Sequence, residues 1–255
     1  MQRALLLLLA SASLLPAQLP PGNDAGVAMG HLHFKTTDTS LHRKLWVDVL
    51  GGTPSKLGMR DIVTLPGVVV LWEKGEPAGG TNGSAVGHVG FKVRNLKDVL
   101  AKARTNGITV ESEKPAFLSG PDGVRIELIE DPALSVPAVN HHIHFYNGAV
   151  DATKAWYVKT FGAKPGKRGN FEAADLPGVN LTFSQAEQPA APTKGRALDH
   201  IGFEVTGLEA FVKRLEAEGV KFDVPYRTVP ALGISIAFLT DPWGTYVELT
   251  EGLRK

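Results

Sequence analysis

The chain contains the same half twice, and this repeat limits the folds that are open to it. HLHF at residues 31–34 returns as HIHF at 142–145, an offset of 111 residues (142 − 31). GHVGF at 87–91 returns as DHIGF at 199–203 (200 − 88 = 112), and IEL at 126–128 returns as VEL at 247–249 (248 − 127 = 121). Such self-similarity indicates two copies of one structural unit. We therefore expect a first domain at residues 28–132 and a second at 138–253.

Each copy divides again into two similar parts. A short alternating segment opens each quarter of the chain and is typical of a strand, as at residues 86–93 and 198–205. Apolar residues at helical spacing follow, for example over 96–105 and 208–218, and further short strands close each quarter. This order of strand, helix and strands, four times over, predicts an α+β fold.

Composition excludes several classes of function. The 27 Lys and Arg residues nearly balance the 26 Asp and Glu residues, and the net charge of +1 provides no basic surface for nucleic acid. There is no cysteine, so disulfides, thiolate nucleophiles and zinc–thiolate sites are all excluded. Any metal would have to be held by nitrogen and oxygen ligands. We expect a small-molecule substrate, and a monomer or homodimer.

The first residues resemble an export signal. Arg3 precedes the apolar run ALLLLLA, and small residues lead to a plausible cleavage site after Ala17. The apolar run is too short to span a bilayer comfortably, so we expect no integral membrane segment in the mature chain. Residues 1–17 are predicted to be a signal peptide, and residues 18–27 a loose leader. The mature protein would then be periplasmic or extracellular.

Three positions with side chains that can bind a metal ion recur in both copies. The six residues are His31, His88 and Glu127 in the first copy and His142, His200 and Glu248 in the second. A glutamate between apolar strand neighbours is costly to bury unless it is paired or bound to a cation. Two imidazoles and a carboxylate form a ligand set for zinc, manganese, nickel, cobalt or ferrous iron. The sequence therefore predicts a divalent metal ion as cofactor.

Other residues are candidates for roles beside the metal. His33 and His144 lie two residues beyond His31 and His142, so they should share the same strand face. They are candidates for a catalytic base, an extra ligand or a hydrogen-bond partner, and plain packing is an equal alternative. Candidates for substrate binding are Asn180, Tyr226 and Arg227. The guanidinium of Arg227 suits an anionic substrate.

The segments around these residues resemble the vicinal oxygen chelate superfamily, which includes glyoxalase I, extradiol dioxygenases and bleomycin-resistance binding proteins. The resemblance covers roughly residues 28–253 and rests on residues 87–93, 121–128, 199–203 and 241–248. It implies paired βαβββ modules that form incomplete β-barrels, with helices outside and the metal inside. It also implies that the six recurring His and Glu residues are the metal ligands.

Two departures from the superfamily argue against its best-known reactions. Glyoxalase I has a further glutamate ligand where this chain has Val69 and Asn180. Extradiol dioxygenases have a tyrosine where this chain has Phe117 and Phe238. A metal-dependent enzyme of unresolved reaction is one hypothesis, and a non-catalytic binding protein of the bleomycin-resistance type is the alternative. The sequence leaves open whether both copies are active. His31 can join either His88 and Glu127 or, across the copies, His200 and Glu248.

Overall fold

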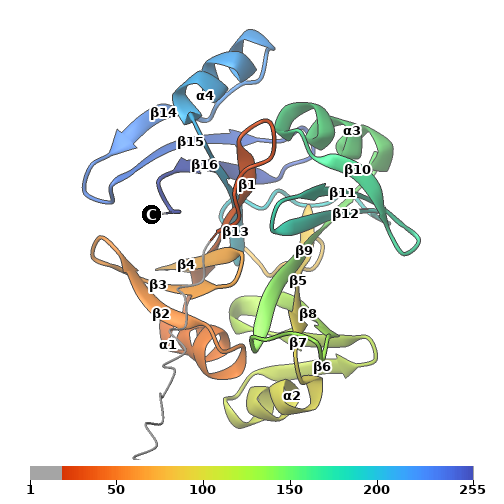
Figure 1. Ribbon diagram of the computed structural model, residues 1–255. Coiled ribbons are helices and arrows are strands. Elements are labelled where there is room, and N and C mark those ends of the chain that lie inside the picture. Colours follow the sequence, from red (N-terminus) through yellow and green to blue (C-terminus); the bar gives the residue numbers. More distant parts are fainter. Residues whose placement is uncertain (1–18, 255) are drawn as a thin grey trace, which may run out of the picture.

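The protein folds into two mixed sheets of eight strands each, which lie side by side (Figure 1). The computed structural model describes residues 19–254. Sheet 1 runs in the order β14 (Val224–Val229), β15 (Ile234–Thr240), β16 (Tyr246–Glu251), β13 (Leu198–Val205), β1 (Val27–Thr36), β4 (Val68–Lys74), β3 (Arg60–Leu65) and β2 (Thr53–Leu57). Sheet 2 runs in the order β10 (Lys164–Arg168), β11 (Phe171–Leu176), β12 (Val179–Gln185), β9 (Ala138–Asn147), β5 (Val86–Val93), β8 (Arg125–Glu130), β7 (Ala116–Ser119) and β6 (Thr109–Glu113).

One helical segment belongs to each of the four modules. The helices are α1 (Thr39–Arg43), which continues as a π-helical turn over Lys44–Val49, then α2 (Leu96–Thr105), α3 (Val150–Phe161) and α4 (Leu208–Ala217), and a short 3-10 turn covers Pro121–Gly123. The predicted helices at 96–105 and 208–218 are confirmed within one residue. The α+β class and the four βαβββ modules are confirmed too, and both sheets remain open at their edges.

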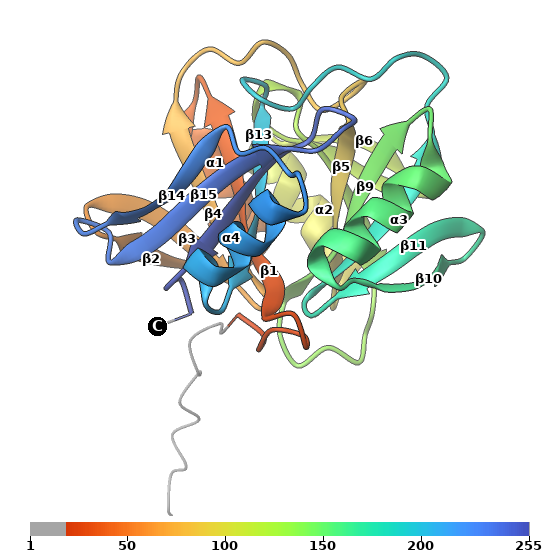
Figure 2. The ribbon, with the colours of Figure 1, turned by 90° about the horizontal axis from the view of Figure 1, so that it is seen from above.

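The modules pair across the two copies of the repeat, which the sequence left open. β1 of the first module runs antiparallel to β13 of the fourth, so sheet 1 joins the beginning of the chain to its end. β5 of the second module pairs with β9 of the third in the same way. Each sheet therefore takes one module from each copy, and the two views in Figures 1 and 2 show this exchange.

Apolar residues and histidines alternate along the central strands, so one face of each sheet packs in the core and the other carries the histidines. Leu32 and Phe34 of β1 are fully buried in the main core, and Phe34 packs against Trp46 of the first helical segment with ring centroids 5.2 Å apart. His31 and His33, at the intervening positions, face the opposite side of the sheet. The core continues between the sheets, where Trp46 meets Phe91 of β5 at 5.6 Å. The helices thus support the face behind each row of histidines.

The segment expected to be a loose leader packs against the protein. Leu19 is buried with Ile62, Val69 and Leu71. The Asn23 amide donates hydrogen bonds to the main-chain oxygens of Phe161 and Gly162, at 3.0 and 2.9 Å. The prediction of looseness is therefore wrong for the described part of this segment, because one apolar and one amide side chain attach it. The predicted signal peptide at residues 1–17 lies outside the described residues. No helix within residues 19–254 is long and apolar enough to cross a membrane.

Candidate metal centres

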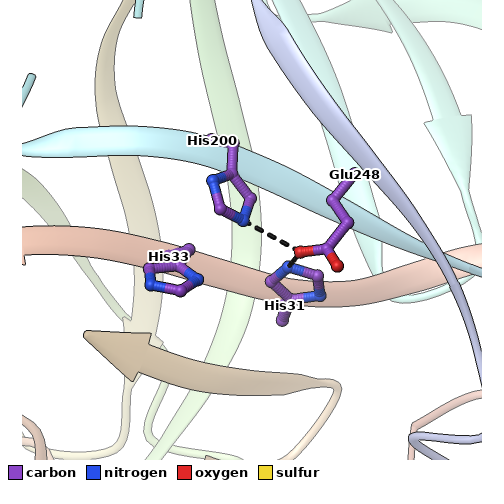
Figure 3. A group of neighbouring side chains, drawn as sticks. All are labelled: His31, His33, His200 and Glu248. Atoms are coloured by element: carbon purple, nitrogen blue, oxygen red, sulfur yellow. Dashed lines mark hydrogen bonds and ion pairs between the residues drawn. The ribbon is translucent and has the colours of Figure 1, made fainter. Parts of the chain in front are cut away.

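Three neighbouring strands of sheet 1 bring four side chains together in what we call centre 1. His31 and His33 come from β1, His200 from β13 and Glu248 from β16, and Figure 3 shows them converging. His31 Nε2 and His200 Nε2 each lie 2.9 Å from the same carboxylate oxygen, Glu248 Oε2. Strand register explains the convergence, because Gly202 lies opposite both His31 and Glu248. Of the two pairings that the sequence allowed, His31 therefore takes the partners from the other copy.

Sheet 2 builds a matching group, centre 2, from His142 and His144 of β9, His88 of β5 and Glu127 of β8. His88 Nε2 and His142 Nε2 lie 3.1 and 3.0 Å from Glu127 Oε2, and 3.2 Å from each other. His144 Nδ1 lies 3.2 Å from His88 Nε2. All six residues predicted as ligands, and both additional histidines, are thus placed at the two centres.

A glycine in each centre leaves room for the first-strand histidine, a feature that the sequence reasoning missed. A Cβ atom on Gly202 would lie 2.0 Å from His31 Cε1, and one on Gly90 would lie 1.9 Å from His142 Cε1. Real Cβ atoms do not approach other atoms so closely, so the histidine ring occupies the space of the missing side chain. The signal was present in the repeat, because the glycine follows the middle histidine by two residues in both copies.

The donor atoms fit a divalent cation. In each centre they lie within 4.8 Å of one another, and they are mostly imidazole nitrogens with one carboxylate. A tetrahedral ion with bonds of about 2.0–2.1 Å sets its ligand atoms roughly 3.3 Å apart, close to the measured separations. The buried Nε2 atom of His33 also lacks a hydrogen-bond partner in the described structure. Buried polar atoms are seldom left so, and a bound ion or its water would satisfy this one.

Comparison with known proteins agrees with this fold. The sequence profile of the Glyoxalase/Bleomycin resistance protein/Dioxygenase superfamily matches residues 140–249. The second copy of the repeat thus carries the sequence pattern of this superfamily. Its structure resembles glyoxalase I from Zea mays, with a TM-score of 0.68 and 17% identity, over 88% of this chain and 92% of that one. A putative dioxygenase from Bacillus subtilis subsp. subtilis str. 168 gives 0.63 and 13%, over 88% and 85%. No curated protein matches the sequence.

A carboxylate behind His200 distinguishes centre 1 from centre 2. Asp199 Oδ1 lies 2.6 Å from His200 Nδ1, so the imidazole is held between Asp199 and Glu248. Burial alone would lower the pKa of His200, but these two carboxylates outweigh it and raise the pKa to about 9. Burial likewise works to raise the pKa of Glu248, yet His31 and His200 hold it well below its usual range. Centre 1 therefore favours an additional positive charge.

Centre 2 has a different electrostatic environment. Gly87 stands where Asp199 stands in the other copy, and the buried Nδ1 of His88 has no hydrogen-bond partner among the described residues. Arg168 Nη2 lies 3.7 Å from Glu127 Oε2, whereas the matching residue in centre 1 is Leu57 (168 − 111). Burial lowers the pKa of His142 to about 4. A cation at centre 2 would thus lack a supporting carboxylate and face a guanidinium.

The linkage between protonation and folding is expected to differ between the centres. His200 has a pKa of about 9 in the folded protein against a reference of 6.5, so its protonation stabilises the fold fully below pH 6.5. For metal-free protein we expect the free energy of unfolding to fall by up to about 3 kcal/mol as pH rises from 6.5 to 9. Urea unfolding across that range in the presence of a chelator measures this. The loss should disappear in His200→Gln and persist in His88→Gln, and parallel curves for all three proteins would contradict the assignment.

The candidate substrate residues are placed less uniformly than the ligands. Arg227 lines a cavity of about 200 Å³ above centre 1, which we call cavity 1. Tyr226, its neighbour on β14, faces the other side of the strand, lines a different hollow beside α4 and lies 3.3 Å from Ser235 Oγ. Asn180 pairs in register with His142, but its amide donates to Asp175 and its oxygen accepts from Thr182. Strand alternation therefore brings Arg227 to a centre and takes Tyr226 away.

Proposed function

We propose that this protein is an exported, metal-dependent enzyme that acts on a small, oxygen-rich substrate at centre 1. The observation that carries the proposal is the convergence of His31, His200 and Glu248 from both copies at the base of cavity 1. A bound divalent ion would act there as a Lewis acid on two neighbouring substrate oxygens. The export part of the proposal rests on the sequence of residues 1–17 alone.

His33 is the group that we assign to proton transfer. It lines cavity 1 beside the ligands, and its ring centroid lies 4.5 Å from that of His200. Burial first, and then the neighbouring His200 and His31, hold the pKa of His33 well below its usual range, so the imidazole is neutral. A neutral imidazole next to the reacting atoms can accept a proton from the substrate at its free Nε2 atom. His144 takes the matching place in centre 2, where its Nε2 lies 2.8 Å from Ser184 Oγ.

Apolar side chains around centre 1 would strengthen this chemistry. The walls of cavity 1 include Leu71, Ile236 and Phe238. A substrate that fills the cavity would displace water, and electrostatic interactions with the remaining polar groups would be stronger in the drier site. The cavity is smaller than the roughly 300–1,000 Å³ that is usual for drug-sized ligands, which favours a small substrate.

Metal analysis tests the proposal first. We expect purified protein, dialysed against zinc, manganese, nickel, cobalt or ferrous iron, to retain at least one ion per chain. Glu248→Gln should lose the ion of centre 1, whereas the matched Glu127→Gln should not. The loaded protein is then assayed against an α-oxo aldehyde, a catechol and an epoxide. Absence of bound metal would overturn the proposal, and metal binding without turnover of any substrate class would favour the binding-protein alternative.

A further inference from the structure

Two hairpins from opposite ends of sheet 1 meet beside cavity 1. The turn between β2 and β3 contacts the turn between β14 and β15, where a Cβ on Gly58 would lie 2.9 Å from the main-chain oxygen of Ala231. Figures 1 and 2 both show the two hairpin tips close together. Leu57, Leu232 and Leu253 form an apolar part of the lining near these tips. The space above centre 1 is therefore a partly open pocket, and its lining is apolar on this side.

Two arginines interrupt this apolar lining. Arg60, next to the β2–β3 turn, and Arg227 of β14 both line cavity 1. Neither guanidinium has an ion pair or hydrogen bond within the described residues, although the nearby Asp61 pairs with Lys56 at 2.6 Å. Glu248 is the acidic side chain of the lining, and it is engaged by His31 and His200. Both arginines are exposed, and the lining of cavity 1 thus has two positive charges that no described carboxylate pairs with.

The repeat supplies an internal comparison for these arginines. The residue that matches Arg60 in the second copy is Phe171 (60 + 111), which packs edge-on against His144 with ring centroids 5.1 Å apart. Arg227 lies between Gly219 and Phe238, where the second copy is longer by nine residues (121 − 112). Neither arginine therefore has a counterpart in the other copy of the repeat, and both line the cavity at centre 1.

We infer that the ligand of cavity 1 is a small organic anion with an apolar body. This inference rests on the proposed function and names its substrate class. The anionic end, a carboxylate or a phosphate, lies between Arg60 and Arg227, where guanidinium groups can bind it through paired hydrogen bonds. The apolar body lies against the leucine and isoleucine side chains of the wall, and two neighbouring oxygens face His31, His200 and Glu248.

Calorimetric titration of zinc-loaded protein tests the inference with 8-hydroxy-7-oxooctanoate as the probe, because its carboxylate is separate from its two neighbouring oxygens. Its methyl ester has no charge and serves as the comparison ligand, and hexyl phosphate separates a phosphate preference from a carboxylate preference. We expect the acid or the phosphate to bind at least about tenfold more tightly than the ester, as loss of charged hydrogen bonds would produce. Arg60→Met and Arg227→Met should each weaken anion binding about tenfold, whereas the exposed Arg94→Met on sheet 2 should not.

The outcomes separate this inference from the proposed function. Equal affinity for acid and ester, unchanged anion affinity in the Arg60→Met/Arg227→Met double variant, or no binding of either anion at millimolar concentration would overturn the inference. Metal content, measured on the same samples, should be unchanged in both arginine variants. Protein that binds the anion through these arginines but retains no metal would support the anion site and refute the metal-dependent function.

Discussion

Gly202→Ala is expected to remove the metal from centre 1 and leave centre 2 able to bind. The new methyl group would lie 2.0–2.5 Å from three ring atoms of His31, so the ring has to leave its position. Because His31 is buried against the strand bearing Gly202, we also expect a loss of about 2–3 kcal/mol in the free energy of unfolding. Metal stoichiometry by elemental analysis and urea unfolding measure the two effects.

Two further glycine variants control this experiment. Gly90→Ala should do the converse, since its methyl group would meet His142 of centre 2. Gly148→Ala should leave both centres unchanged, because the nearest atom to its Cβ is Gln185 Nε2 at 4.0 Å. Wild-type metal content at centre 1 in folded Gly202→Ala protein would show that His31 is not a ligand. If Gly202→Ala does not fold, the smaller change His31→Gln tests the same ligand.

Centre 1 is expected to bind a divalent cation at least about 100-fold more tightly than centre 2. A carboxylate behind a ligating histidine typically changes metal affinity 10–100-fold, and only His200 has one. Arg168, which lies 3.7 Å from Glu127, repels a cation at centre 2. Arg125, which stacks on Phe117 at 3.8 Å, lies beside the same centre, but its charge is paired with Glu111 at 2.8 Å. Competition with a chromogenic chelator should therefore resolve one tight and one weak ion per chain.

Exchange of matched residues tests the origin of that difference. Asp199→Gly should weaken binding at centre 1 by 10–100-fold, since it recreates the environment of His88. Arg168→Leu should strengthen binding at centre 2, since it recreates the environment provided by Leu57. Two ions of equal affinity in the wild type, or no response to either substitution, would show that the charges around the centres do not set their affinity.

The sequence could predict the modules and the residues that cluster at the two centres because both rest on local patterns. Strand alternation and helical spacing are properties of short segments, and the repeat marked His88 and His200 as equivalent. The sequence could not predict which modules pair. Nothing in the sequence of β1 shows whether it pairs with β13 or with β5, because these two strands occupy equivalent positions in the repeat and have similar sequences. Long-range strand pairing depends on how all four modules pack together.

The remaining differences have similarly physical causes. Tyr226 and Arg227 were both predicted as candidates for substrate binding. Neighbouring strand residues point to opposite faces, and only the assembled sheet determines which of the two faces the centre. The role of Asp199 appears only through its 2.6 Å contact with His200. A comparison of Gly87 with Asp199 would have been the one sequence signal for it. Contacts of Leu19 and Asn23 likewise depend on residues far away in the chain.

The exchange of modules between the sheets has a consequence for the history of the chain. A single copy of the repeat holds only part of each centre, since His31 and the pair His88–Glu127 belong to different sheets. Two separate copies could complete both centres only by associating as a symmetric dimer. Because the two chains of such a dimer are identical, a substitution in the sequence would change both centres at once. Joining the copies in one chain removes that constraint, so Asp199, Arg60 and Arg168 can each alter one centre and leave the other as it was.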